Sequence, residues 1–558
     1  MAQKTAARLA LAITCWLLLL TRWVWTFSYQ TNDDQLLSWL LESHTFGLSD
    51  AAWGPYLALI GPALSNLYAV LPALPWYGLF FYGYLALVCS LLVYTALVLL
   101  HPRWGWWTAF LLVAAIGWAV FPEHWIGFNF TRAATLGAGA ALLGESTVSP
   151  GHKQARWLRI LVLVLAVCIR PQAALMGSLI GGAWLMLVRV QRASPGQRQA
   201  LLVAGLMLVG TLVLPRILPG QIPVNEHDRV DGHNAYLDYG LIRPQWARNA
   251  QDSLLEEGLA RWFDADTKAY DAAFFERATW PSWKASQRWK NFPDRTRWQA
   301  VRASQAPDTL PSIRTGSLLL SLILLHGLMA PSRQSNKYAR WAMPLLILLT
   351  VLGLAAMAYF LKLPNRVLQP AFTLTVFGAL LCLSSSTQRG PGRKWLIAAA
   401  LAVGFWGIWP QMALRKKQSN AIEANRAIIS RWWAAYPDSL RERPTLISLP
   451  VYMRLLVDGD PLANYVLPPD PWLIDGWVAR LPSYQVYLAE RLDIMSYDAQ
   501  WCQWAEEGAV LISTQDNAGF FNRYLQAQYG LELVMEPIWG REGISAFLLT
   551  VAGPCSMR

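Results

Sequence analysis

The sequence predicts an α-helical polytopic membrane protein with a C-terminal soluble α/β domain. Its 558 residues are 54% hydrophobic and only 15% charged. Several apolar stretches approach the length of about 20 residues that a helix needs to cross a bilayer. Lys and Arg gather in short loops on one side of these stretches, so the net charge of +12 indicates a membrane topology rather than nucleic-acid binding.

The predicted spans number about eleven by the usual length criterion and follow one another along the first 412 residues. They lie at 9–27, 77–100, 104–122, 129–145, 157–169, 173–189, 200–216, 313–330, 341–361, 366–384 and 395–412. The basic, uncleaved N-terminus is typical of a signal anchor, so we expect it in the cytoplasm. The odd number of spans then places the C-terminal domain on the outer side of the membrane, and for the bacterial inner membrane that we expect, this side is the periplasm.

Two segments decide this topology. Residues 54–75 are apolar but contain four prolines. A full crossing there would put the basic loops outside, so we interpret the segment as interfacial or re-entrant. Basic residues at both ends of 157–189 predict a hairpin with Arg170 at its outer tip, instead of one long helix.

Three large segments are expected outside the membrane: loop 28–75, loop 217–312 and tail 413–558. The first domain therefore comprises residues 1–412 with both loops, and the tail is the second. Loop 217–312 predicts helices around 246–263 and 267–290. The tail begins with an amphipathic stretch, Ile422–Trp433.

After that stretch, apolar runs predict a small α/β domain. Strands are expected at 445–449, 509–513, 531–537 and 544–551, with a helix at 519–528. Cys502 and Cys555 are the only cysteines of the tail, and whether they form a disulfide stays open.

Ionisable side chains at the outer ends of the spans are the candidate functional residues. The strongest candidates are Asp33 and Asp34, because adjacent carboxylates at a membrane boundary are costly to desolvate and repel each other. One can act as general base toward an acceptor hydroxyl while the other orients it or binds a cation. The structural alternative is an N-cap at Asn32 or Asp33. Asp33 is the better-placed cap, which favours Asp34 as the base, but which of the two aspartates is the base stays open.

Two arginines are candidates for binding a phosphate or pyrophosphate group. Arg170 precedes Pro171, and Arg366 follows Pro364-Asn365. Guanidinium groups bind phosphate through charge-assisted, bidentate hydrogen bonds. The alternative is that both side chains reach lipid headgroups.

Further outer residues are candidates for substrate contact: Glu123, His124, His227, Asp231, His233 and Asn365. For Glu123 and His124, a solvated turn is the alternative. For the run 226–233, metal binding, acceptor contact and a solvated loop stay open, because no strict zinc pattern is present. A divalent cation is therefore left open as a cofactor. The sequence contains no Walker A loop, dinucleotide-binding glycine motif or His-Glu-x-x-His, which disfavours ATP-driven transport and zinc proteolysis.

This set of residues resembles the GT-C superfamily of integral-membrane glycosyltransferases. Its members typically carry an acidic residue or pair in the first outer loop, which Asp33 and Asp34 match. Many have an Arg-Pro element in a mid-chain helix, like Arg170-Pro171. Many also have an Arg near the start of a late span with a Pro shortly after, like Arg366 and Pro370.

The resemblance implies a hexosyl or pentosyl transferase of cell-envelope glycan biosynthesis. Such an enzyme moves a sugar from a polyprenyl-phosphate donor to a glycan, lipid or protein hydroxyl outside the membrane, with inversion. The aspartates then activate the acceptor, Arg366 and Arg170 bind the departing phosphate, and an apolar groove between the spans holds the polyprenyl tail. Membrane lipid is a further expected partner.

Alternative functions remain. A polysaccharide polymerase or ligase also uses lipid-linked donors, but does not need the acidic pair. A non-enzymatic transporter of lipid-linked glycans favours ionisable groups at mid-membrane. An assembly subunit would act through its C-terminal domain.

Overall fold

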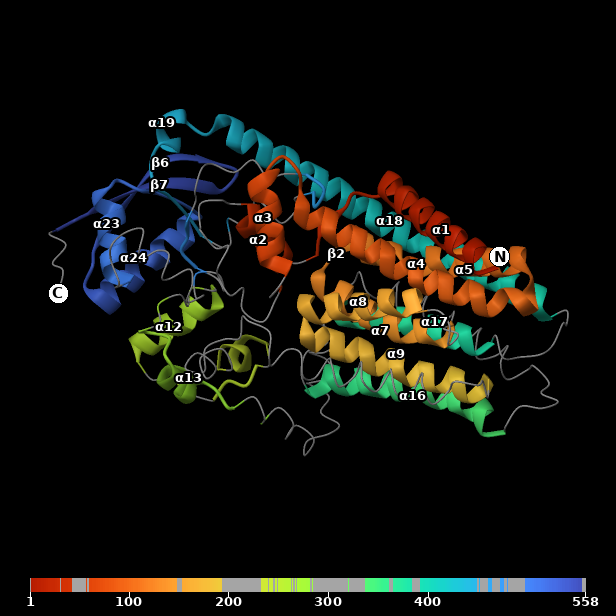
Figure 1. The fold of residues 1–558 in the computed structure, drawn as a ribbon. Coiled ribbons are helices and arrows are strands. Elements are labelled where there is room, and N and C mark those ends of the chain that lie inside the picture. The colour runs from red at the N-terminus through yellow and green to blue at the C-terminus, as the bar shows by residue number, and fades with distance from the viewer. Residues whose placement is uncertain are drawn as a thin grey trace.

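The protein is described by a computed structural model, in which a helical bundle lies at one end and a lobe with a sheet at the other (Figure 1). The structure describes residues 2–30, 32–42, 57, 60–147, 153–192, 232–238, 240–243, 246–247, 249–261, 263, 266, 268–281, 284, 320, 337–360, 365–383, 392–448, 451, 460–463, 472–475, 479 and 497–553.

The helices of the bundle coincide with predicted spans. They are α1 (Ala2–Val24), α4 (Trp76–Trp104), α5 (Trp106–Val120), α7 (Phe130–Gly144), α8 (Lys153–Ile169), α9 (Pro171–Arg192), α16 (Lys337–Phe360), α17 (Asn365–Leu383) and α18 (Gly392–Ala435). The predicted spans 200–216 and 313–330 lie outside the described residues, apart from Leu320. Within the described part of the chain, four helices are long and apolar enough to cross a membrane, namely α1, α4, α9 and α16. The count of eleven spans therefore stays a prediction.

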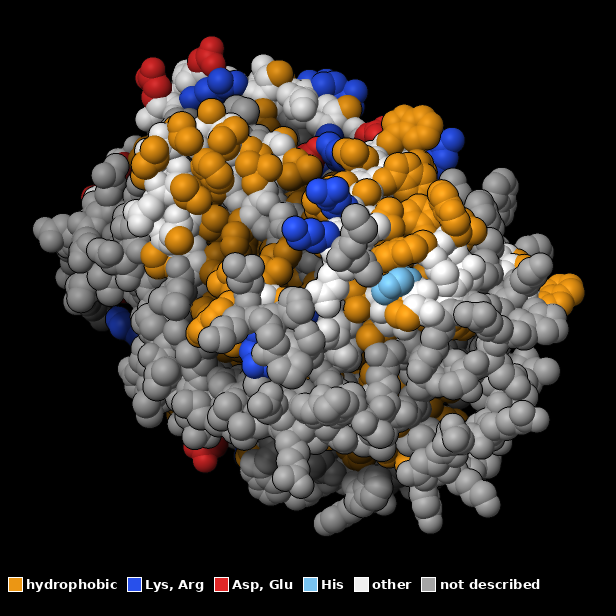
Figure 2. Space-filling view, turned by 45° about the vertical axis from the view of Figure 1, so that its right-hand side comes forward, with side chains coloured by type: hydrophobic (Ala, Val, Ile, Leu, Met, Phe, Trp, Pro, Cys, Tyr) orange, Lys and Arg blue, Asp and Glu red, His pale blue; other side chains and the backbone are white. Residues whose placement is uncertain are grey.

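Apolar side chains cover much of the described surface of the bundle, as the space-filling view shows (Figure 2). Trp16, Leu19 and Trp23 of α1 are exposed, as is Trp107 of α5. Exposed apolar surface on this scale is unfavourable in water and favourable in lipid, which agrees with a membrane-embedded bundle.

Helix α7 lies at the centre of the bundle, and every residue from Phe130 to Gly144 is buried. It packs closely against α9, where a Cβ atom added to Gly177 would lie 2.0 Å from the backbone oxygen of Thr135. One turn further, a Cβ atom on Gly181 would lie 2.5 Å from the backbone oxygen of Gly139. Small residues thus allow the two backbones to touch, as is common in membrane helix pairs.

The same contacts set the directions of the helices. The order Gly177 to Gly181 follows Thr135 to Gly139, so α9 runs parallel to α7. Helix α8 runs antiparallel to α7, because Tyr84 lies against Gly137 and also bonds the backbone of Val162, whereas Arg159 lies against Gly144. Helices α8 and α9 therefore form the predicted hairpin, with Arg170 between them.

Helices α4 and α17 run in the direction of α7 as well. Tyr84 and Leu91 of α4 lie against Gly137 and Gly144. Leu374 of α17 and Gly181 of α9 both lie against Gly139, and Gly378 of α17 lies against Trp184 of α9, so α17 runs parallel to α9. The N-termini of α4, α7, α9 and α17 consequently lie at the same end of the bundle, the end nearest to the lobe.

The loop after α1 also lies at this end. It contains β1 (Ser28–Tyr29), α2 (Asn32–Glu42) and α3 (Ile60–Val70), and β1 pairs in parallel with β2 (Gly127–Phe128), which follows α6 (Pro122–Ile126). Helix α3 has 11 residues and a length of about 16 Å, too short for a hydrocarbon core of about 30 Å. This agrees with an interfacial or re-entrant segment.

The lobe is built around a five-stranded sheet in the order β4-β3-β5-β7-β6. Its strands are β3 (Thr445–Ile447), β4 (Trp472–Leu473), β5 (Val510–Ser513), β6 (Leu533–Arg541) and β7 (Ile544–Val551). The β4-β3-β5 part is parallel, and β7 is antiparallel to both β5 and β6. Helices α19 (Asp438–Arg441), α23 (Tyr497–Glu506) and α24 (Gln515–Tyr529) complete the lobe. The predicted strands and the predicted helix at 519–528 are confirmed.

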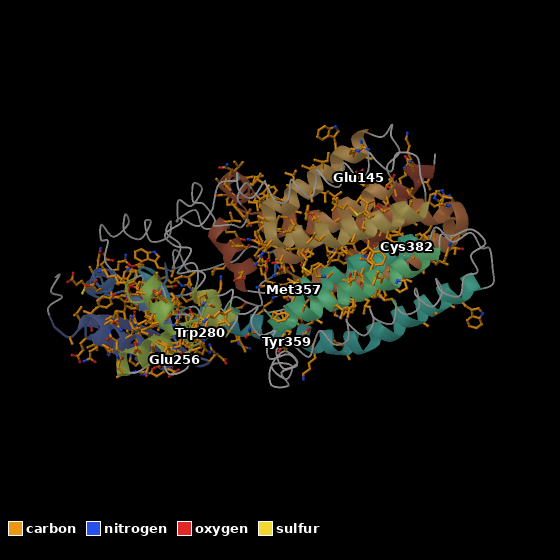
Figure 3. All side chains as sticks on the ribbon, turned by 90° about the horizontal axis from the view of Figure 1, so that it is seen from below. Glu145, Glu256, Trp280, Met357, Tyr359 and Cys382 are labelled. Atoms are coloured by element: carbon orange, nitrogen blue, oxygen red, sulfur yellow. The ribbon has the colours of Figure 1, made fainter. Side chains whose placement is uncertain are left out.

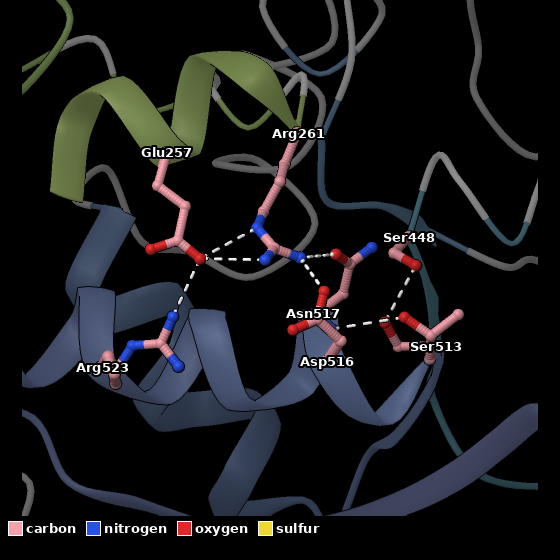
Figure 4. A network of polar contacts seen from close by, with 8 residues as sticks. Glu257, Arg261, Ser448, Ser513, Asp516, Asn517 and Arg523 are labelled. Atoms are coloured by element: carbon pink, nitrogen blue, oxygen red, sulfur yellow. Dashed lines mark hydrogen bonds and ion pairs between the residues drawn. The ribbon is translucent and has the colours of Figure 1, made fainter. Parts of the chain in front are cut away.

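The described residues of the long loop predicted at 217–312 belong to the same lobe. Its helices α12 (Ala250–Ala260) and α13 (Ala272–Ala278) are shorter than predicted. Phe263 packs against Phe520, Phe521 and Tyr524 of α24. Arg261 joins the end of α12 to the start of α24 through a polar network (Figure 4). Side-chain sticks show Glu256 and Trp280 within this lobe, and Tyr359 near the end of α16 that faces it (Figure 3).

Two further features of the tail are the position of its boundary with the bundle and the state of Cys502. The predicted domain boundary at residue 412 lies inside α18, which has 44 residues. Residues 411–435 contain neither Gly nor Pro, so the stretch Ile422–Trp433 continues this helix. Cys502 is disulfide-bonded, whereas Cys555 lies outside the described residues.

Candidate functional site

An ion pair joins the first turn of α2 to the first turn of α17. Arg366 Nη1 lies 3.5 Å from Asp33 Oδ2, and the two side chains are 24% and 29% exposed. Acidic residues in the first turn of a helix are favoured by the helix dipole, which explains why Asp33 is tolerated in α2. Two residues predicted independently are thus brought together, and both remain accessible to a ligand.

Asp34 has a different environment, because its side chain is fully buried. Its Oδ1 accepts hydrogen bonds from the backbone N–H of Phe130 at 2.8 Å and from the hydroxyl of Tyr77 at 3.3 Å. Its Oδ2 accepts from Asn129 Nδ2 at 2.8 Å. Both oxygens therefore bind donors inside the protein, which leaves Asp34 badly placed to reach an acceptor hydroxyl. Of the two aspartates, Asp33 has the more accessible carboxylate, which does not favour Asp34 as the base.

The expected N-cap is also wrong in detail. Helix α2 begins at Asn32, so Asp33 and Asp34 both lie inside its first turn. Asp34 instead binds the first backbone N–H of α7, at Phe130. The first N–H groups of a helix have no partner within it, and a carboxylate satisfies one of them while favouring the positive end of the dipole.

Arg170 lies between α8 and α9 and reaches the same first turn of α7. Its Nη1 donates to Thr131 Oγ1 at 2.6 Å, and its guanidinium lies 5.4 Å from the centroid of the Phe130 ring. The hydroxyl of Thr131 and the ring of Phe130 fix the direction of the side chain. The start of α7 therefore holds both Arg170 and Asp34.

Glu123 and His124 lie in α6 and are buried, with 5% and 0% of their surface exposed. Gln369 Nε2 donates to Glu123 Oε2 at 3.2 Å, and His124 Nε2 lies 2.9 Å from Thr373 Oγ1. The solvated turn is therefore wrong, and these contacts with α17 do not support the expected contact with substrate. Burial, and then the charge of Arg132, lower the pKa of His124 well below its ordinary value, so the imidazole is neutral.

The remaining candidates do not join this site. His233 is buried in the lobe, where its ring lies 6.5 Å from that of Phe275 in α13. His227, Asp231 and the side chain of Asn365 lie outside the described residues. The described part of the chain contains no group of three or more His, Cys, Asp or Glu side chains arranged to hold a metal ion.

Several residues that support the site were not predicted. They are Tyr77, Asn129, Thr131, Gln369 and Thr373. Asn129 did carry a local signal, because its side chain caps α7 by accepting a hydrogen bond from Thr131 N–H. The other four are ordinary residues of apolar helices, and their partners are distant in sequence.

No known family model and no curated protein matches this chain. Two solved structures are similar to it, both of ArnT from Cupriavidus metallidurans. The form bound to undecaprenyl phosphate is 11% identical, with a TM-score of 0.36, and the similarity covers 98% of each chain. The apo form is 12% identical, with a TM-score of 0.36, and the similarity covers 99% of this chain and 100% of that one. These values are too low to transfer a function, so the candidate site rests on its own contacts.

Proposed function

We propose that the chain is a membrane glycosyltransferase that moves a sugar from a polyprenyl-phosphate donor to an acceptor hydroxyl at the outer membrane face. The observation that carries this proposal is the Asp33–Arg366 pair, in which an accessible carboxylate and an accessible guanidinium lie 3.5 Å apart. A general base and a phosphate-binding cation are the two groups that such a transfer requires.

In the proposed reaction, the acceptor oxygen attacks the anomeric carbon while its proton passes to Asp33. The bond between the anomeric carbon and the phosphate oxygen breaks, and its electron pair leaves with the phosphate. The attack comes from the face opposite to the leaving group, so the configuration is inverted. Asp33 takes the role of base because its carboxylate is 29% exposed, whereas that of Asp34 is enclosed by three donors.

Negative charge builds up on the departing phosphate, and positive groups fixed before the reaction stabilise it. Arg366 lies in the first turn of α17, and Arg170 directly precedes α9. The positive ends of both helix dipoles lie at the same end of the bundle and favour an anion there. Asp34 then acts indirectly, since it joins α2 to the start of α7 and so fixes the position of Asp33.

The transporter alternative is less well supported. Within the described helices α4, α5, α7, α9 and α17, Asp, Glu, Lys and Arg residues occur only near the helix ends, as with Arg103, Arg132, Arg189 and Arg366. A transporter is expected to place such groups nearer to mid-membrane. A polymerase or ligase uses the same donor class, and its independence of the acidic pair is open to test.

The test is transfer or hydrolysis by the purified protein, supplied with polyprenyl-phosphate sugars and a panel of acceptors. We expect Asp33→Asn to lower turnover by a factor of about 100 or more, the usual contribution of a general base. Asp460→Asn is the matched control, because Asp460 forms an ion pair with Arg22 at 2.5 Å, outside the proposed site. Absence of turnover with every donor would remove the enzyme proposal, and an active Asp33→Asn variant would remove the base.

A further inference from the structure

Helix α17 presents three polar side chains on the face that contains Arg366. Gln369 follows Arg366 by three positions, and Thr373 follows Gln369 by four. Residues with this spacing lie one above another on a helix. Gln369 and Thr373 are 6% and 2% exposed, so this polar stripe continues from the accessible Arg366 into the interior.

Each buried member of the stripe contacts one residue of α6. Gln369 bonds the carboxylate of Glu123 at 3.2 Å, and Thr373 bonds the imidazole of His124 at 2.9 Å. Buried polar groups need partners because an unsatisfied one costs free energy. Helix α17 is therefore held in the rotation about its axis that keeps both bonds.

We propose that Glu123 and His124 are positioning residues, which bind Gln369 and Thr373 and thereby set the place of Arg366. This inference rests on the proposed function, in which Arg366 binds the donor phosphate. Successive residues of an α-helix are separated by about 100°, so even a partial rotation of α17 would turn Arg366 away from Asp33. The pair in α6 thus acts on the phosphate through α17, without touching it.

The test compares two threonines of the same helix. Thr373→Val removes the hydroxyl that binds His124 while conserving shape. Thr375→Val is the matched control, because Thr375 is equally buried at 2% but its hydroxyl bonds the backbone oxygen of Ala371 in its own helix. Each change is made in the wild-type and the Arg366→Ala background, and binding of a polyprenyl phosphate to the purified full-length protein is measured.

We expect Thr373→Val to weaken binding about five-fold, the effect of one buried hydrogen bond. Thr373→Ser should restore it, and Thr375→Val should leave it unchanged. In the Arg366→Ala background, Thr373→Val should have no further effect, because coupled residues are not additive. Equal losses in both backgrounds, or an equal loss from Thr375→Val, would show general destabilisation and overturn the positioning role.

The same experiment separates this inference from the proposed function. If Arg366→Ala leaves binding of polyprenyl phosphate unchanged, the proposed phosphate site itself is wrong. If Arg366→Ala weakens binding and Thr373→Val does not, the phosphate site stands and the positioning role is wrong.

Discussion

Asp34 and Phe130 are 96 residues apart, and the carboxylate of Asp34 accepts a hydrogen bond from the backbone N–H of Phe130 at 2.8 Å. This bond joins the loop after α1 to the start of the central helix of the bundle. It also gives the two adjacent aspartates different partners and so different roles. Asp34 fixes the loop in place, and its neighbour Asp33 meets Arg366 on the accessible side.

The first prediction follows from this separation. Asp34→Asn removes the negative charge and turns one acceptor into a donor, opposite donors of Asn129 and Phe130. We expect a loss of about 2–3 kcal/mol in stability, typical of hydrogen bonds to a charged group. Asp33→Asn should cost less than about 1 kcal/mol, because its ion pair is partly exposed. Thermal unfolding in detergent measures both, and equal losses would contradict the assigned roles.

A second prediction concerns the hydrogen bond that orients the side chain of Arg170. Thr131→Val removes the hydroxyl that accepts its hydrogen bond at 2.6 Å. The guanidinium of Arg170 then loses the hydrogen bond that helps to fix its direction. We expect the KM for the donor to rise about five-fold, as for the loss of one hydrogen bond. Thr135→Val is the control, because the hydroxyl of Thr135 bonds the backbone of its own helix. A Thr131→Ser variant with the same defect as Thr131→Val would argue against this role.

The third prediction tests the contact between α7 and α9. A Cβ atom at Gly177 would lie 2.0 Å from the backbone oxygen of Thr135, so Gly177→Ala must push the helices apart. Overpacking of this kind costs about 1–3 kcal/mol. Gly353→Ala is the control, since nothing lies within 4 Å of a Cβ atom there. The thermal stability of the two variants, measured side by side, should differ clearly, and similar values would exclude the close helix contact.

Much of the fold could be predicted from local sequence patterns, because helices and strands depend largely on residues that are close together in the sequence. Apolar runs and basic loops placed the described helices of the bundle, and the cations flanking 157–189 indicated the hairpin at Arg170. Apolar strand-like runs likewise placed β3, β5, β6 and β7. The predicted topology also puts Asp33 and Arg366 on the same side of the membrane, in agreement with their ion pair.

The roles within the site were not predictable in the same way. Which aspartate is buried depends on where the start of α7 lies, and Asn129 is distant from Asp34 in sequence. Likewise, Glu123 and His124 follow a helix end that resembles a solvated turn. They are buried because other helices pack over them, among them α17, more than 200 residues later. Burial is a tertiary property, so no local pattern indicated it.

A fourth prediction concerns the response of the lobe to pH. The hydroxyl groups of Tyr524 and Tyr529 both donate to Asp266. Burial is the main cause that raises the pKa of each tyrosine above its ordinary value, and Asp266 adds to it. The folded lobe therefore keeps these protons more tightly than the unfolded chain, which releases them near pH 10. The stability contributed by the tyrosines is present below about pH 10 and is lost as the pH rises further.

We therefore expect the lobe to unfold at alkaline pH, and Tyr524→Phe to reduce the steepness of this loss. The same variant should be less stable near pH 7 by about 1 kcal/mol, since one hydrogen bond is missing. Near-UV circular dichroism of the full-length protein, followed during thermal unfolding between pH 8 and pH 11, measures both effects. An unchanged pH profile in Tyr524→Phe would rule out this tyrosine as a source of the alkaline loss.

The last prediction concerns the attachment of the loop that contains α12 and α13 to the C-terminal tail. Arg261 donates to Asp516 at 2.7 Å and to Asn517 at 2.5 Å, and it also bonds Glu257 of its own helix (Figure 4). The hydrogen bond and charge of Arg261 lower the pKa of Asp516, so both partners are charged at neutral pH. Arg261→Ala should therefore release the end of α12 from α24.

Since Asp516 is largely exposed, we expect only a small loss of stability, together with faster hydrogen exchange confined to α12 and the start of α24. Arg277→Ala is the matched control, because Arg277 pairs with Asp252 inside the loop and does not reach the tail. Faster exchange in α24 with Arg261→Ala alone would establish Arg261 as the link between loop and tail. If hydrogen exchange in α24 is no faster in Arg261→Ala than in Arg277→Ala, the aromatic contacts of Phe263 with α24 hold the loop without Arg261.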